Sequence, residues 1–334
     1  MFNKLLILRS PGIGPARYNE LLRRFETPAA VVDFLNVSDD VRDSVLCEME
    51  RAEQLGVHYL CDNDARYPEN LRAVKNHAPV ISVRGNMNAL GKKMVAVVGT
   101  RHATATGMGF VADIAQKFAE HNYAVVSGMA IGTDTAAHRG ALRANENAVT
   151  IAVLAGGVDY VWPLENESLY YEVLERGLVI SEMPVGFVPV ATNFVQRNKL
   201  IAGLGEKLIL GEADLKSGSM TTARFAIDMK REIWAIPSHP ADLRAFGPNS
   251  LIRDGMAHMC MGADDFFESA KKDIKKLKKV DAENNLIDAV GMIPVSESVL
   301  ADVVKKSVPE IKAQLVVLEL QGFVRKVDGG YVRA

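Results

Sequence analysis

The sequence has few cysteines, and their spacing fits neither a metal site nor a disulfide framework. Its 334 residues include three cysteines, Cys47, Cys61 and Cys260, an odd number without a CxxC pair. Unpaired thiols are typical of a reducing compartment. No apolar run is long enough for a membrane span, and the N-terminus lacks the cleavage pattern of a secretion signal. We therefore expect a cytoplasmic protein without a zinc site and without a membrane partner.

The sequence also lacks a strong net charge and the usual signatures of catalysis. Its formal net charge is −2 and its pI about 6.4, so any contact with nucleic acid has to be confined to a local patch. The GxGxxG fingerprint of a dinucleotide site is missing, which argues against a nicotinamide-dependent oxidoreductase. No serine or cysteine nucleophile accompanies a histidine in a recognisable triad. We expect no catalytic residue, no metal and no cofactor.

Apolar runs alternate with helical patterns between residues 94 and 261. The runs are VAVVG, YAVVS, VTIAVLAG, LVIS, KLILGE and EIWAIP. Each run is continuous, as in strands that are buried on both faces. The pattern predicts a Rossmann-like α/β fold with a doubly wound parallel sheet, whose ligands bind at the carboxyl ends of the strands.

Smaller domains are predicted on both sides of this sheet. We expect an N-terminal helical domain at 1–85, the Rossmann-like domain at 86–268, a basic linker at 269–283 and a winged-helix domain at 284–334. The lysines of the linker indicate either a solvated tether or an additional attraction for phosphate.

Both flanking domains leave their use open. The segment SPGIGPARYNELLRRF predicts a tight hairpin before a helix, in the manner of a helix-hairpin-helix. Its glycines either let the backbone approach a DNA phosphate or only connect two helices. The recognition helix expected in the winged helix carries Lys312 but also Glu310 and Glu319, so it serves either DNA or protein contacts.

Loops that follow the predicted strands contain the candidate binding residues. Arg101, at the first strand's carboxyl end, suits a phosphate or a stacked base, or else pairs with a carboxylate at a domain interface. Trp162 either stacks on a base or packs under its own loop. In the second turn, we expect Asp134 to cap a helix and to bond His138, four residues later.

A second group of candidates surrounds a predicted helix and the loop SGSMTT. Arg197 and Lys199 stand at the expected helix start, where both side chains can meet a phosphodiester backbone. The backbone N–H groups of Ser217, Gly218 and Ser219 precede another helix, whose N-terminus favours an anion. The sequence therefore predicts anion recognition, and no metal set is evident among the nearby carboxylates.

Seven motifs together resemble the DNA-processing protein A (Smf) family over nearly the whole chain. They are GTRHAT, SGMAIGTDTAAH, TIAVLAGGVDYVWP, ISEMP, FVQRNKLIAGL, SGSMTTARFA and NSLIRDGMA. The resemblance implies an extended Rossmann fold and a DNA-binding groove. The residues that match the family's functional loops are Gly99, Thr100, Arg101, Ser127, Gly128, Arg197, Asn198, Lys199, Ser217, Gly218 and Ser219. Trp162-Pro163 replaces the family's Tyr-Pro, and Lys199 replaces an arginine.

The resemblance implies a role without catalysis. Members of this family bind single-stranded DNA, protect incoming strands during natural transformation, and load the RecA recombinase as homodimers. The alternative is a nucleoside-monophosphate hydrolase of the lysine-decarboxylase-like Rossmann group. Those enzymes carry a glutamate in their phosphate loop, whereas the corresponding segment here ends in Arg224.

Overall fold

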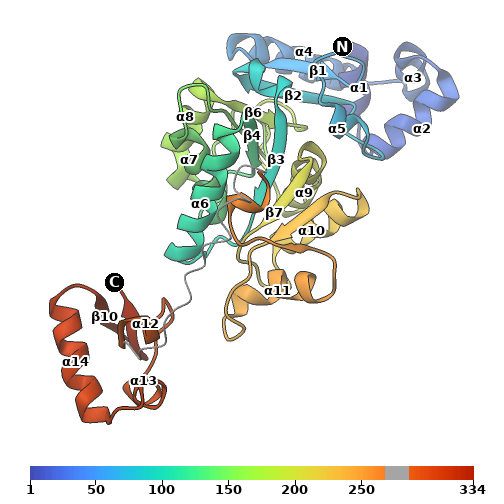
Figure 1. The fold of residues 1–334 in the computed structure, drawn as a ribbon. Coiled ribbons are helices and arrows are strands. Elements are labelled where there is room, and N and C mark those ends of the chain that lie inside the picture. The colour runs from blue at the N-terminus through green and yellow to red at the C-terminus, as the bar shows by residue number, and fades with distance from the viewer. Residues whose placement is uncertain (268–285) are drawn as a thin grey trace. The chain divides into compact units, whose positions relative to one another are not determined.

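The computed structural model describes residues 1–267 and 286–334, so the predicted linker lies outside the described residues. The chain divides into two compact units, Met1–Lys271 and Lys272–Ala334. The first unit contains a nine-stranded sheet and most of the helices (Figure 1). The second unit is small and has a core of its own.

The sheet of the first unit confirms the predicted α/β class. Its strand order is β1-β2-β6-β5-β4-β3-β7-β8-β9. All pairs from β6 to β9 are parallel, whereas β1 and β2 are antiparallel additions at one edge. The six predicted apolar runs form β3 to β8. The strands are β1 (His58–Cys61), β2 (Val80–Gly85), β3 (Lys93–Val98), β4 (Tyr123–Ser127), β5 (Thr150–Val153), β6 (Leu178–Ser181), β7 (Lys207–Leu210), β8 (Glu232–Ala235) and β9 (His258–Met259).

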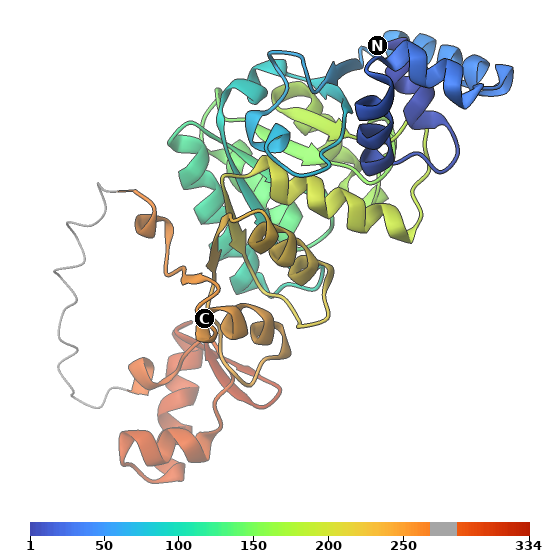
Figure 2. The same ribbon diagram turned by 90° about the vertical axis from the view of Figure 1, so that its right-hand side faces the viewer.

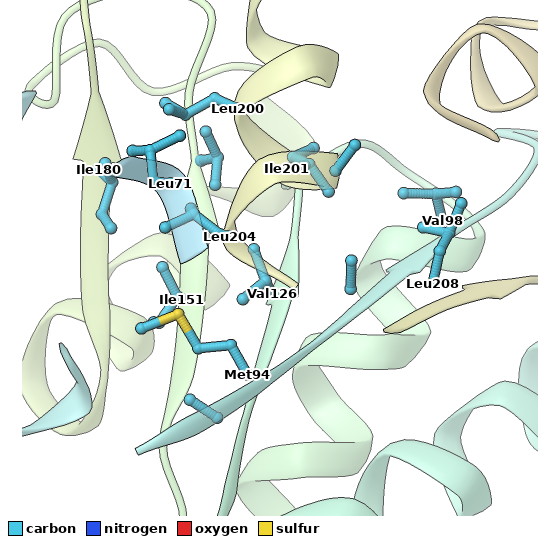
Figure 3. Packing of buried hydrophobic residues seen from close by; sticks show 14 of the residues in the cluster. Leu71, Met94, Val98, Val126, Ile151, Ile180, Leu200, Ile201, Leu204 and Leu208 are labelled. Carbon is cyan, nitrogen blue, oxygen red and sulfur yellow. The ribbon is translucent and has the colours of Figure 1, made fainter. Parts of the chain in front are cut away.

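Burial on both faces explains why the strand sequences are continuously apolar. Successive side chains of a strand point to opposite faces. In β3, Met94 and Val98 join one core cluster, which Figure 3 shows at close range, while Val95 and Val97 join the cluster on the other face. Helices exclude water from both faces of the sheet, so a polar residue at every second position would be buried without a partner.

Helices cover both faces of the sheet. The first cluster includes residues of α5 (Glu69–Arg72), α9 (Ala191–Leu204), α10 (Gly218–Asp228) and α11 (Phe246–Arg253). The opposite face packs against α6 (Ala105–Glu120), α7 (Thr133–Arg143) and α8 (Glu167–Arg176). Figure 1 shows α6, α7 and α8 on one side of the strands and α9 and α10 on the other, and Figure 2 looks onto the side of α9 and α10. The short 3-10 helices are η1 (Met87–Gly91), η2 (Leu164–Asn166), η3 (Leu243–Ala245) and η4 (Ala263–Asp265).

The N-terminal segment begins with four helices and then supplies the two antiparallel strands. The helices are α1 (Phe2–Arg9), α2 (Pro15–Phe25), α3 (Pro28–Leu35) and α4 (Asp39–Gln54). As predicted, a tight turn joins the first two: Gly12 has a φ of +76° and Pro15 occupies the first turn of α2. The sequence did not predict β1 and β2, which extend the sheet.

The second unit has the element order that the sequence predicts, three helices followed by a hairpin. The elements are α12 (Leu286–Ala289), α13 (Glu297–Val304), α14 (Val308–Leu320), β10 (Val324–Val327) and β11 (Gly330–Arg333). Leu300, Ile311 and Leu315 are fully buried in its core. Lys312 on α14 pairs with Glu297 on α13, so its charge is partly balanced within the unit.

Candidate functional site

A cavity opens where the direction of the sheet reverses. After β3 the chain builds β4, β5 and β6 on one side, and β7 then returns to the other side of β3. The carboxyl ends of two strands that diverge in this way frame a crevice, the usual ligand position in such folds. The cavity has a volume of about 310 Å³. It is lined by eight of the twelve predicted site residues: Gly99, Thr100, Arg101, Arg197, Asn198, Ser217, Gly218 and Ser219.

Arg101 lies at the mouth of this cavity among aromatic rings. Its guanidinium carbon is 4.8 Å from the ring centroid of Trp162 and 5.8 Å from that of Phe194. The two rings meet edge to face with centroids 4.7 Å apart. Arg101 is exposed and makes no ion pair with the described residues, so the suggested interface carboxylate is absent there. Arg101 therefore presents a positive charge beside the partly exposed rings of Trp162 and Phe194.

Phe194 is a site residue that the sequence analysis missed. It occupies the first turn of α9 and lines the same cavity as Arg197, three residues later. The spacing of three places both side chains on one face of a helix. The spacing of three could have identified Phe194. Without knowledge of where the helix begins, however, a phenylalanine at this position is equally consistent with a core residue.

Arg197 is buried, with 6% of its surface exposed, and bonds to the protein itself. Its Nη1 donates to the carbonyl oxygens of Val153, at 2.9 Å, and of Gly128. Burial lowers the pKa of Arg197, and Asp134 opposes that shift. A side chain at Gly128 would disrupt this arrangement, because an added Cβ would collide with Arg197 Nη1. Arg197 therefore holds the ends of β4 and β5 in position.

The predicted hydrogen bond between Asp134 and His138 is wrong. The Nδ1 of His138 lies 2.7 Å from Thr150 Oγ1, and that hydroxyl donates to the carbonyl of Val125. The ring nitrogen is therefore the donor. Burial lowers the pKa of His138 to about 3, so the ring is neutral.

Asp134 does not cap its helix either. α7 begins after Gly132 without a side-chain cap, and Asp134 Oδ2 instead accepts from the Ala130 amide at 3.2 Å. Burial raises the pKa of Asp134, and the charge of Arg197 acts in the opposite direction. The carboxyl group is therefore buried and bonded to the backbone of its own turn.

The start of α10 forms another wall of the cavity. Ser217 caps the helix by accepting from the Met220 amide at 3.4 Å. The prediction that the Ser217 N–H is free for an anion is wrong, because it donates to the backbone carbonyl of Asp214 at 2.9 Å. The first-turn amides of Gly218 and Ser219 have no acceptor within the helix, because no preceding turn exists. The Asn198 amide donates to the Gly218 carbonyl at 3.2 Å, so α9 and α10 are fixed to each other. The arrangement favours an anion.

The remaining predicted residues lie outside this cavity. Ser127 is fully buried and donates to the Val97 carbonyl at 2.7 Å. Lys199 lies on another face of α9, where its ammonium donates to the carbonyls of Lys75 and Asn76. The structure does not bring Lys199 to Arg101. Gly128 and Trp162 line a small hollow that adjoins Phe194 and Arg197.

A carboxylate of the protein occupies the N-terminus of α6, where a dinucleotide phosphate would bind in a Rossmann site. Glu212 accepts from the amide of Thr104 at 2.7 Å and from its hydroxyl at 2.5 Å. An added Cβ at Gly107 would lie 2.7 Å from the same carboxylate. The anion position of this turn is therefore filled from within, which agrees with the missing glycine fingerprint.

Two absences bear on the class of site. Within the described residues, no three histidine, cysteine or acidic side chains gather so that they would hold a metal ion. None of the described helices is long and apolar enough to cross a membrane.

Comparisons with known proteins agree with the motifs. The family model for DNA recombination-mediator protein A matches residues 58–271. Protein Smf of Escherichia coli is 32% identical over 318 residues, which cover 90% of this chain and 83% of that protein. The DNA processing protein DprA of Bacillus subtilis is 33% identical over 214 residues, which cover 64% of this chain and 71% of that protein.

Solved structures show the same fold. DNA processing protein A from Streptococcus pneumoniae superposes with a TM-score of 0.70 at 28% identity and covers 79% of this chain and 96% of its own. DNA processing protein A from Helicobacter pylori, described by its single-stranded DNA binding mode, gives a TM-score of 0.58 at 28% identity, with 65% and 96% covered. The motifs and the fold agree with these relatives, and the chain belongs to the DNA recombination-mediator protein A family.

Proposed function

We propose that this protein is a recombination mediator that binds single-stranded DNA at the cavity between β3 and β7. The observation that carries the proposal is the exposed Arg101 beside the rings of Trp162 and Phe194. Single strands are held without sequence preference by cationic groups that meet the backbone and by aromatic faces that stack on bases. The α10 N-terminus adds amide donors for a phosphate.

Membership of the family supports the same function. The Helicobacter pylori relative is described as binding single-stranded DNA, and that chain shares this fold. From the family resemblance we further propose that the protein acts in natural transformation, protects incoming strands and loads RecA as a homodimer in the cytoplasm. We assign the helices and hairpin of 286–334 to a winged helix. Because Lys312 is paired with Glu297, protein contacts suit this unit better than DNA.

The alternative, hydrolysis of a nucleoside monophosphate, is not favoured. It requires a carboxylate that is free to act as a base or nucleophile in the phosphate loop. Among the described residues that line the cavity, the acidic one is Asp134, which is buried and already accepts from the Ala130 amide. We therefore propose binding and not catalysis.

The test is a fluorescence-anisotropy titration of a labelled oligo(dT) with wild type and Arg101→Ala at several salt concentrations. Removal of one charge-assisted hydrogen bond is expected to weaken binding about tenfold. The plot of log K against log salt is expected to become shallower by about 0.7 for each phosphate that the variant no longer neutralises. Arg253→Ala is the control, because Arg253 is exposed on α11 and, among the residues that the structure describes, pairs with its neighbour Asp254 alone. Unchanged affinity of Arg101→Ala would refute the assignment of the site.

A further inference from the structure

A second, larger cavity lies on another face of α9. Its volume is about 530 Å³, and it lies entirely within the unit Met1–Lys271. The hairpin residues 13–15 form part of one wall, and Gln196, Lys199 and Leu200 of α9 form another. The proposed DNA site uses different α9 residues, so the two cavities are chemically distinct. The volume suits a nucleotide-sized ligand.

Glu182 places an unpaired carboxylate in this cavity. It follows β6 directly and lies among mostly apolar residues such as Phe187 and Leu200. It forms neither a hydrogen bond nor an ion pair with the described residues. Burial raises the pKa of Glu182, while the charges of Lys199 and Arg9 lower it. A partly buried acid without a donor is costly unless a ligand supplies one.

The cations near Glu182 are held elsewhere. Arg9 donates to the two carboxylate oxygens of Glu48 from Nε and Nη2, each at 2.8 Å. The Lys199 ammonium donates two hydrogen bonds, to the carbonyls of Lys75 and Asn76, at 3.2 and 3.1 Å. An ammonium has three hydrogens, so one remains. The cavity therefore offers a carboxylate acceptor and, from the side of α9, one N–H donor.

We infer that this cavity binds the guanine base of a nucleotide. Guanine presents two neighbouring donors, N1–H and the N2 amino group, which match the two oxygens of Glu182. The adjacent O6 is an acceptor for Lys199. Adenine, cytosine and thymine each lack the pair of adjacent donors and would turn an acceptor toward the carboxylate. The apolar walls suit the faces of a purine ring.

An adjoining hollow provides for the phosphate. It shares Asn76 and His77 with the cavity and is also lined by Arg17, Arg23 and Lys75. Arg17 pairs with Glu20 on the same helix, whereas Arg23 and Lys75 form no ion pair with the described residues. A base in the cavity therefore leaves its phosphate beside exposed positive charge.

The experiment is calorimetric titration of the full-length protein with dGMP, dIMP, dAMP, dCMP and dTMP. We expect dGMP to bind, dIMP to bind more weakly because it lacks the N2 amino group, and the others to bind at least about tenfold more weakly than dGMP. Glu182→Gln is expected to weaken dGMP at least about tenfold, because its amide turns a donor toward N1–H. Glu175→Gln, an exposed change on α8, is the control and is expected to bind dGMP like wild type.

A second titration distinguishes a free nucleotide from a base within a bound strand. Oligo(dT) and the same oligonucleotide with one central dG are compared in wild type and Glu182→Gln. A preference for dG that disappears in Glu182→Gln assigns the cavity to a strand, and equal affinities together with dGMP binding assign it to free nucleotide. The inference would be overturned by equal binding of all five nucleotides, or by absent binding of all five together with no preference for dG in the strand. It would also be overturned by dGMP binding that Glu182→Gln leaves unchanged while circular dichroism shows a folded variant. Binding of oligo(dT) itself reports on the Arg101 site, so the two proposals fail separately.

Discussion

Replacing Arg197 tests whether this residue supports the site or contacts the ligand. In Arg197→Ala, the carbonyls of Gly128 and Val153 lose their shared donor and Asp134 loses its opposite charge. Leaving two buried carbonyls without their donor and a buried carboxylate without its nearby positive charge is expected to cost about 3–5 kcal/mol. We expect the free energy of unfolding to fall by that amount and Tm by about 10 °C.

The assay is urea unfolding followed by tryptophan fluorescence at pH 7. The double variant Arg197→Met, Asp134→Leu is expected to recover at least about half of the loss, because no isolated charge remains. The difference in the free energy of unfolding between wild type and Arg197→Ala is also expected to become smaller as the pH is lowered. The folded-state pKa of Asp134 lies above its unfolded value, so the cost of its charge disappears as the carboxyl takes up a proton.

A loss below about 1 kcal/mol would refute the structural role of Arg197, since such a value is typical of an exposed ion pair. Equal losses in the single and double variants would show that Asp134 is not the partner that matters. Arg101→Ala is the matched comparison. It removes an exposed arginine and is expected to change stability by less than about 0.5 kcal/mol.

The His138 ring is neutral in the folded state, where its pKa is near 3, so unfolding takes up a proton below about pH 6.5. The free energy of unfolding is therefore expected to fall by up to about 1.4 kcal/mol per pH unit below that pH. Urea unfolding of wild type and His138→Gln at several pH values measures this slope. Gly140→Ala is expected to lower the free energy of unfolding by about 1–3 kcal/mol, because the added Cβ would collide with the Ala112 carbonyl; Gly109→Ala, with open space around it, is expected to gain about 0.5–1 kcal/mol. Glu212→Gln is expected to weaken oligo(dT) binding severalfold, because the Thr104 bonds that hold the Arg101 turn are impaired; anisotropy measures the change.

Each of these expectations has an outcome that contradicts it. A pH slope that persists unchanged in His138→Gln would assign the acid sensitivity to other groups. Equal stabilities of Gly140→Ala and Gly109→Ala would show that α6 and α7 are not in close contact at Gly140. Wild-type affinity in Glu212→Gln would show that the turn keeps its conformation without the carboxylate.

The class of fold was determined by the sequence, because strands buried on both faces leave no freedom for polar residues. Six continuous apolar runs became β3 to β8, and the helical patterns between them became the covering layers. β1 and β2 escaped prediction. Their place at the sheet edge depends on the pairing of β2 with β6 and of β1 with β2, and nothing local specifies that pairing.

The sequence also located the loops of the candidate site, because the carboxyl ends of parallel strands gather at one edge wherever the strands are correctly predicted. The turn at Arg101 and the start of α10 were found in this way. What each charged residue does was decided only by the tertiary structure. Arg197 and Lys199 are two positions apart in one motif, yet Arg197 is buried and bonded to two strand-end carbonyls, whereas Lys199 lines a separate cavity.

The physical reason is that burial and partners are set by contacts between distant segments. Arg197 is committed because Gly128 and Val153 end their strands beside it, and Asp134 reaches it from a third segment. Arg101 has no acidic partner among the described residues, because the acid that contacts its own turn, Glu212, is already bonded to Thr104. Sequence spacing determines which face of a helix a side chain occupies, but the fold decides whether that face meets solvent, a partner or a ligand.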